Sequence, residues 1–150
     1  MHYLETQDSI GYWEDFSKQK VMWKIIGCNI NFSYDDSAMI CNNAVNIMTG
    51  KKTYLLQFVG LMNSKLFDWY LKITTEAGVQ GGGVQLYVTT LEKTPLKLDF
   101  EKSFSDLVEK KCKGENISDD ELDERIFSLY NLSKEEREYV LTNYKPNTSI

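Results

Sequence analysis

The chain has 150 residues, 42% of them hydrophobic, and a formal net charge of −5 from 17 basic and 22 acidic side chains. This size and composition predict one folded domain, and the absence of an apolar run of about 18 residues argues against a transmembrane helix. A single histidine, His2, argues against Ser-His-Asp and Cys-His catalysis and against a His-rich zinc site. Three well-separated cysteines and an N-terminus without the pattern of a signal peptide favour a cytoplasmic protein.

The first third of the chain predicts mainly strands and turns. Residues 1–19 are polar with scattered aromatic side chains, which is typical of a loop or a short helix. The segment 20–30 is rich in Val, Ile and Trp and predicts a strand. Polar turns are predicted at 31–37 and 49–52, on either side of a pair of strands within 38–48.

The rest of the chain predicts helices around one further strand. Apolar residues spaced three and four apart predict a single long helix over 54–73. A glycine-rich loop at 75–83 then leads to an alternating, β-branched segment at 84–90, which predicts a strand. Three helices are predicted in the final third: 103–112, 118–129 and 133–143.

The negative charge is concentrated in this helical region. Residues 1–98 contain 9 lysines and 9 acidic residues, whereas residues 99–150 contain 8 basic and 13 acidic residues. Predicted capping boxes at 118–121 and 133–136 place carboxylates in first helical turns, where the helix dipole favours them. The net negative charge therefore has a local structural reason. It does not exclude DNA as a partner, although the phosphates of DNA require basic side chains elsewhere in the chain. A phosphate-facing surface is expected in the first two-thirds.

Three polar groups in the charge-neutral part are candidates for such a surface: Asn42-Asn43, Lys51-Lys52 and Asn63-Ser64-Lys65. Amide side chains can bond adenine through two hydrogen bonds, and lysine can contact phosphate or guanine. The competing interpretation is turn chemistry for the asparagine pair and a solvated helix face for the other residues.

Two further motifs match a phosphate-binding loop and a nuclease metal site only poorly. The loop 75–83 follows a helix and precedes a strand, the reverse of a phosphate-binding loop, so a flexible connection or a close backbone approach is expected. Asp99, Asp106, Glu109 and Lys111 loosely resemble a nuclease metal site. Because Glu109 and Lys111 lie in a predicted amphipathic helix, a solvated helix face is the ordinary explanation for them, and a metal site is not expected.

Several segments within 20–140 follow one another in a distinctive order. They include Lys24-Ile25-Ile26, Phe32-x-Tyr34-Asp35 and the exit Leu91–Leu96. The most specific pieces are the helix Leu61-Met62-Asn63-Ser64-Lys65-Leu66 with Trp69-Tyr70, and the tail from Leu122-Asp123 to Glu135-Glu136. This order of segments resembles that of the TaqI-like C-terminal specificity domain.

This resemblance implies a non-catalytic domain that recognises a DNA sequence in a restriction–modification enzyme. Residues 1–150 would form a single target-recognition domain within a longer protein, with a helical subregion at 103–143. Other domains of that protein would methylate adenine N6 or cleave, and would bind the S-adenosylmethionine and Mg²⁺ that this domain lacks. The partners would be double-stranded DNA and those domains.

The expected fold is α+β, with a twisted mixed sheet or partial barrel, one packed central helix and a C-terminal helical appendage. The DNA-contacting residues are expected on a positive, concave face opposite the acidic helices, whereas Asn63, Leu66 and Trp69 are expected to be structural. The candidates are Asn42, Asn43, Lys51, Lys52, Gln80, Gly81, Gly82 and Gln85, with Lys65 as a phosphate contact. The alternative is a protein–protein interaction module that uses the acidic helices.

Overall fold

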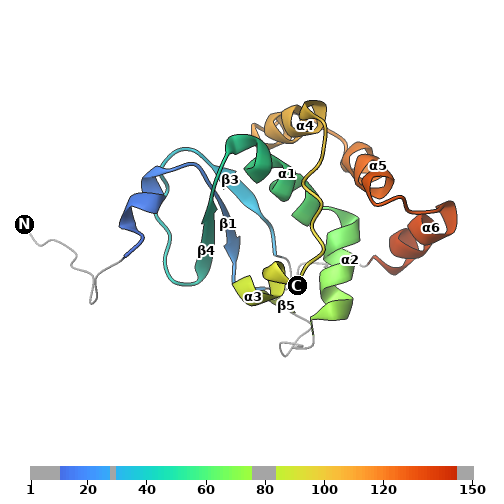
Figure 1. Cartoon of the computed structure of the whole chain (residues 1–150), viewed down its shortest axis with the longest axis horizontal. Coiled ribbons are helices and arrows are strands. Elements are labelled where there is room, and N and C mark those ends of the chain that lie inside the picture. Colours follow the sequence, from blue (N-terminus) through green and yellow to red (C-terminus); the bar gives the residue numbers. More distant parts are fainter. Residues whose placement is uncertain (1–10, 28–29, 76–83, 145–150) are drawn as a thin grey trace, which may run out of the picture.

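The computed structural model describes residues 11–27, 30–75 and 84–144 (Figure 1). The strands are β1 (Lys20–Lys24), β2 (Ile26–Gly27), β3 (Ser33–Asp35), β4 (Val45–Thr49) and β5 (Val84–Gln85). The helices are the 3₁₀ turn η1 (Trp13–Ser17), α1 (Lys52–Met62), α2 (Lys65–Thr74), α3 (Val88–Glu92), α4 (Lys102–Cys112), α5 (Asp119–Leu129) and α6 (Lys134–Asn143).

The strands form two small sheets, and all strand pairs in the described part of the chain are antiparallel. The larger sheet has the order β3-β1-β4, with Lys20 opposite Asp35 and Thr49, and Lys24 opposite Val45. The second sheet pairs β2 with β5. These strands and helices confirm the α+β class, and the sheet is open rather than closed into a barrel.

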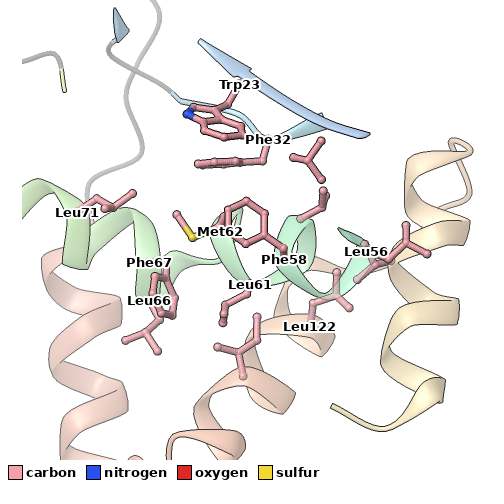
Figure 2. Packing of buried hydrophobic residues seen from close by; sticks show 14 of the residues in the cluster. Trp23, Phe32, Leu56, Phe58, Leu61, Met62, Leu66, Phe67, Leu71 and Leu122 are labelled. Atoms are coloured by element: carbon pink, nitrogen blue, oxygen red, sulfur yellow. The ribbon is translucent and has the colours of Figure 1, made fainter. Parts of the chain in front are cut away.

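Helices α1 and α2 lie between the sheet and the C-terminal helices, so the hydrophobic core has two sides (Figure 2). On the sheet side, Trp23 stacks on Phe32 with ring centroids 5.5 Å apart, and Phe32 meets Phe58 of α1 edge to face. Eight consecutive residues of α1, Leu55–Met62, are buried, because both faces of this helix are covered. The central helix is therefore the element that joins the two halves of the molecule.

The C-terminal helices pack on α1 and α2 rather than on the sheet. Phe104 and Val108 of α4, Ile126 and Phe127 of α5, and Val140 of α6 all belong to the buried core. Gly60 permits the close approach of α4, because a Cβ there would lie 2.6 Å from Val108 Cγ2. The helical appendage is thus part of the same core.

Three predictions for the first third of the chain were partly wrong: the turn at 31–37, the pair of strands within 38–48 and the strand at 20–30. Residues 31–37 contain β3, and the turn begins only at Asp35, whose carboxylate accepts hydrogen bonds from Ser37 and Met39. In segment 38–48 only β4 forms, since Ala38 takes a φ of 59° that interrupts an extended chain. The strand predicted at 20–30 is divided at Ile25 into β1 and β2.

The strand predicted at 84–90 is also shorter than expected, because β5 ends at Gln85. Leu86 is fully buried and its N–H donates the last ladder hydrogen bond to Ile25 O. Residues Val88–Glu92 then form α3, so tertiary packing overrides the β propensity of the sequence there.

The long helix predicted at 54–73 is two helices. The first ends at Met62 with Asn63 as its C-cap, and Ser64 caps the second, where its hydroxyl accepts a hydrogen bond from Phe67 N. The capping box predicted at Ser133 is present, with Glu136 as the reciprocal partner. The one predicted at Ser118 is absent, because Ser118 makes no side-chain cap and Glu121 instead pairs with Arg125.

None of the helices in the described ranges is long and apolar enough to cross a membrane.

Candidate nucleic-acid interface

Two of the segments that carry candidate DNA-contact residues meet at one end of the sheet, on either side of Ile25. The N–H of Ile25 donates to Ala44 O at 3.1 Å, and its carbonyl accepts from Leu86 N at 2.7 Å. The loop that carries Asn42 and Asn43 and the strand that carries Gln85 are therefore both held against this single residue. We call the group Lys24, Asn42, Asn43 and Gln85 the amide end of the sheet.

The amide side chains at this end differ in how many hydrogen bonds they already make within the protein. Asn42 Oδ1 accepts a hydrogen bond from Ala44 N at 3.1 Å, so this side chain holds its own turn. Asn43 is exposed and makes no side-chain hydrogen bond with the described residues. The Gln85 amide nitrogen donates to the hydroxyl of Tyr87, and the Gln85 carbonyl oxygen accepts no hydrogen bond from the residues that the structure describes. Asn43 and Gln85 are thus the freer of the three.

Lys24 belongs to the same end, although the sequence did not single it out as a site residue. It is exposed, forms no ion pair in the described ranges, and lies opposite Val45, two residues after Asn43. The sequence signal was hidden, because Lys24 lies inside what was predicted as one uninterrupted strand. Only the pairing of β1 with β4 brings its charge beside the asparagines.

The lysine pair Lys51-Lys52 lies at the opposite end of β4. Strand Val45–Thr49 separates the two ends by about 13 Å, at roughly 3.3 Å per residue. Lys51 is exposed and has no ion-pair partner among the described residues. Lys52 Nζ, in contrast, lies 2.8 Å from Glu109 Oε1 of α4. Hydrogen bonds from Lys113 and Lys52 hold the pKa of Glu109 at about 2, so this carboxylate stays charged.

Lys65 is also held by the acidic helices. Its Nζ lies 2.5 Å from Asp120 Oδ1 and 3.2 Å from Asp123 Oδ2, both on α5. The hydrogen bond to Asp120 is the main reason that the pKa of Lys65 is raised. The expectation that the candidate lysines lie opposite the acidic helices is therefore wrong for Lys52 and Lys65. A phosphate contact by either one requires it to leave a carboxylate.

The residues expected to be structural have structural contacts. Asn63 Oδ1 accepts a hydrogen bond from Phe32 N at 2.9 Å, and the Asn63 amide nitrogen donates to Phe32 O at 2.7 Å. The side chain thus bonds both backbone groups of Phe32, as a neighbouring β-strand would. Leu66 is buried, and Trp69 packs against the core. Three predicted site residues, Gln80, Gly81 and Gly82, lie outside the described residues.

The carboxylates that loosely resembled a nuclease site do not assemble. Glu109 binds Lys52 and Lys113, and Lys111 pairs with Asp119. Across residues 11–27, 30–75 and 84–144, no group of three His, Cys, Asp or Glu side chains is placed to hold a metal ion. The described part of the chain thus offers polar contacts rather than a metal centre.

Comparison with known families gives one match. The family model of the TaqI-like C-terminal specificity domain matches residues 2–96. This range includes both sheets, α1, α2 and every candidate contact residue, and ends before α4. The tail that carried part of the sequence resemblance therefore lies outside the matched range. No curated protein matches the chain.

Proposed function

Because the chain belongs to the family of TaqI-like C-terminal specificity domains, we propose that it recognises the DNA target of a restriction–modification enzyme. The match over residues 2–96 is the observation that supports this most strongly. In this proposal the domain positions double-stranded DNA, and other domains of the same protein methylate adenine N6, cleave, or do both. S-adenosylmethionine and Mg²⁺ are then needed by those domains and not by this one.

We assign base contacts to the amide end of the sheet. Asn43 keeps both the acceptor and the donor that a bidentate contact with adenine requires, and Gln85 keeps its carbonyl acceptor and the second N–H of an amide that already donates to Tyr87. Lys24 beside them supplies a positive charge for a phosphate. Asn42 is assigned mainly to holding the turn, since its carbonyl oxygen is already bonded.

We assign a second phosphate contact to Lys51, which lies beyond the far end of β4. The strand itself is about 13 Å long, similar to the width of the major groove, about 12 Å, so one duplex can contact residues at both ends of the strand. Lys52 and Lys65 are left out of this set because carboxylates of α4 and α5 already hold them. Gln80, Gly81 and Gly82 remain candidates from the sequence alone.

The ion pairs also favour DNA recognition over the alternative of an acidic interaction module. Asp119, Asp120 and Glu124 of α5 pair with Lys111, Lys65 and Arg137, respectively. Much of the acidic charge of these helices is therefore already matched within the chain, and less of it remains for a basic partner.

A binding titration on the full-length enzyme tests the proposal. Gln85→Ala should relax the preference at one base pair by about 1–3 kcal/mol, because it removes a base contact. Lys24→Ala and Lys51→Ala should weaken binding to all sequences alike, and each should reduce the salt slope by about 1. Fluorescence anisotropy with cognate and altered duplexes at several salt concentrations measures both effects.

Lys134→Ala is the matched control, because Lys134 is an exposed lysine on α6, outside the family match. It should leave affinity, specificity and salt slope unchanged. The proposed contacts are incorrect if Lys24→Ala, Lys51→Ala and Gln85→Ala all behave like this control.

A further inference from the structure

Two lysines share one carboxylate where the end of α4 meets the start of α1. Glu109 Oε1 lies 2.8 Å from Lys52 Nζ and 2.6 Å from Lys113 Nζ. One negative charge therefore faces two positive charges, so this group of three side chains keeps a net positive charge. The Glu109 side chain is 24% exposed, whereas those of Lys52 and Lys113 are 42% and 66% exposed. The positive groups are thus the more accessible part of the group.

Two further lysines lie next to this shared carboxylate. Lys51 directly precedes Lys52, and Lys110 lies three residues before Lys113 on α4, which is the spacing of neighbours on a helix surface. Both are exposed, and neither forms an ion pair in the described ranges. We call Lys51, Lys52, Lys110 and Lys113 the lysine cluster.

The other acidic side chains near the cluster do not engage its lysines. Asp36 raises the pKa of Lys52 through space, after the larger effect of Glu109, and Asp106 precedes Lys110 by one turn of α4. Glu115 lies in the turn that follows α4. None of these three carboxylates forms an ion pair among the residues that the structure describes. They weaken the field of the cluster at long range, but its ammonium groups remain available for direct contact.

An anion can bind this cluster without leaving a carboxylate unpaired. If Lys52 or Lys113 turns to a phosphate, the other lysine still holds Glu109. Lys65 differs, because within the described ranges it is the only ion-pair partner of two carboxylates of α5, one of them the buried Asp123. Its departure would leave a buried charge unpaired, which is costly. The shared carboxylate therefore makes Lys52 a better phosphate ligand than Lys65.

We propose that the lysine cluster binds the phosphates of DNA, so that α4 extends the DNA surface beyond the part of the chain that matches the family. Lys110 and Lys113 lie outside the matched residues 2–96. The inference rests on the proposed function for its partner and adds a contact from the C-terminal helices. Glu109 limits the strength of this contact, because it always occupies one of the lysines.

Neutralisation of Glu109 tests the proposal through a gain of binding, which a folding defect cannot produce. Glu109→Gln releases both lysines. The full-length enzyme should then bind cognate and altered duplexes about threefold more tightly at about 50 mM salt, with a salt slope steeper by about 1. Fluorescence anisotropy measures both. Glu121→Gln is the matched control, because it removes the same charge and also breaks an i,i+4 pair, with Arg125 on α5. It should change neither quantity.

Removal of the two lysines of α4 tests the same contact in the opposite direction. Both side chains are exposed, and Glu109 stays paired with Lys52, so the double variant Lys110→Ala/Lys113→Ala should fold normally. It should weaken binding to all sequences alike and lower the salt slope by about 2. Lys102→Ala is the control, because Lys102 is an exposed lysine at the other end of α4. It should leave binding unchanged.

The variants at the amide end of the sheet separate this inference from the proposed function. If Lys24→Ala and Gln85→Ala alter DNA binding while Glu109→Gln and the double variant behave like their controls, the inference is overturned and the proposed function stands. If none of the four alters DNA binding, both fail. A lower unfolding temperature of the full-length enzyme for the double variant, with an unchanged salt slope, would place the cluster against another domain and also overturn the inference.

Discussion

Lys20 and Asp35 form a buried ion pair between the central strand and an edge strand of the sheet. Lys20 Nζ lies 2.5 Å from Asp35 Oδ2, and the two residues are 0% and 7% exposed. Lys20 also donates to Phe16 O at 2.9 Å, so the pair ties η1 to both strands. A charge this deeply buried is tolerated only with a partner and further hydrogen bonds, both of which are present here.

Removal of one partner of this pair should strongly destabilise the fold. Lys20→Met leaves the Asp35 carboxylate buried without its cation, and should lower the free energy of unfolding by about 3–5 kcal/mol. Lys18→Met, which breaks an exposed pair with Asp15, should cost less than about 1 kcal/mol. Urea denaturation compares the two variants. Similar losses for both would show that burial does not set the strength of the Lys20–Asp35 pair.

The same carboxylate should make stability depend on pH under acid conditions. Burial by itself raises the pKa of Asp35, but hydrogen bonds from Lys20, Ser37 and Met39 outweigh it and lower the pKa from 3.8 to about 2. A lowered pKa in the folded state means stability that is complete above pH 4 and is lost as the pH falls toward 2. This contribution amounts to about 2 kcal/mol.

Two measurements check this dependence. A ¹³C NMR titration should give the Asp35 carboxyl a midpoint near 2, the value expected for the folded state. Urea unfolding at pH 5 and pH 2.5 should show the accompanying loss of stability. A midpoint near 4 would mean that the hydrogen bonds do not favour the charged form.

The hydrogen bonds between Asn63 and Phe32 should stabilise the join between β3 and the α1–α2 break. Asn63→Ala leaves the Phe32 peptide without two partners, and should lower the free energy of unfolding by about 1–3 kcal/mol. Asn31→Ala is the control, because Asn31 is an exposed neighbour without a side-chain hydrogen bond in the described ranges. Thermal unfolding should show a larger loss of stability for Asn63→Ala than for Asn31→Ala. Equal losses would mean that the hydrogen bonds of Asn63 do not stabilise the fold.

The contact of α4 with α1 should depend on the absence of a side chain at Gly60. The Cβ of Gly60→Ala would lie 2.6 Å from Val108 Cγ2 and 2.8 Å from Phe104 Cζ. Such overpacking should cost about 1–3 kcal/mol in unfolding free energy. Adding Val108→Ala should recover part of this loss, because it removes the nearest atom. Gly11→Ala, with nothing within 4 Å of its Cβ, should have little effect.

The sequence alone determined the elements whose signals are local. The apolar period over 54–73, the acidic first turns and the Ser133 capping box all depend on residues within a few positions of one another. They correctly predicted helical structure in those segments, and the segment order correctly indicated the family. The uneven charge likewise identified the acidic helices before any contact was known.

Only the tertiary structure decided where these elements break and which charges remain free. The long helix divides at Ser64, which caps α2, and at Asn63, whose side chain bonds Phe32, a residue distant in the sequence. The DNA-contact candidates behave in the same way: Lys51 and Lys52 are adjacent in the chain, yet a carboxylate 57 residues away holds only Lys52. Ion pairs and buried hydrogen bonds between distant residues form only after the chain has folded, so the sequence pattern cannot show which lysine they neutralise.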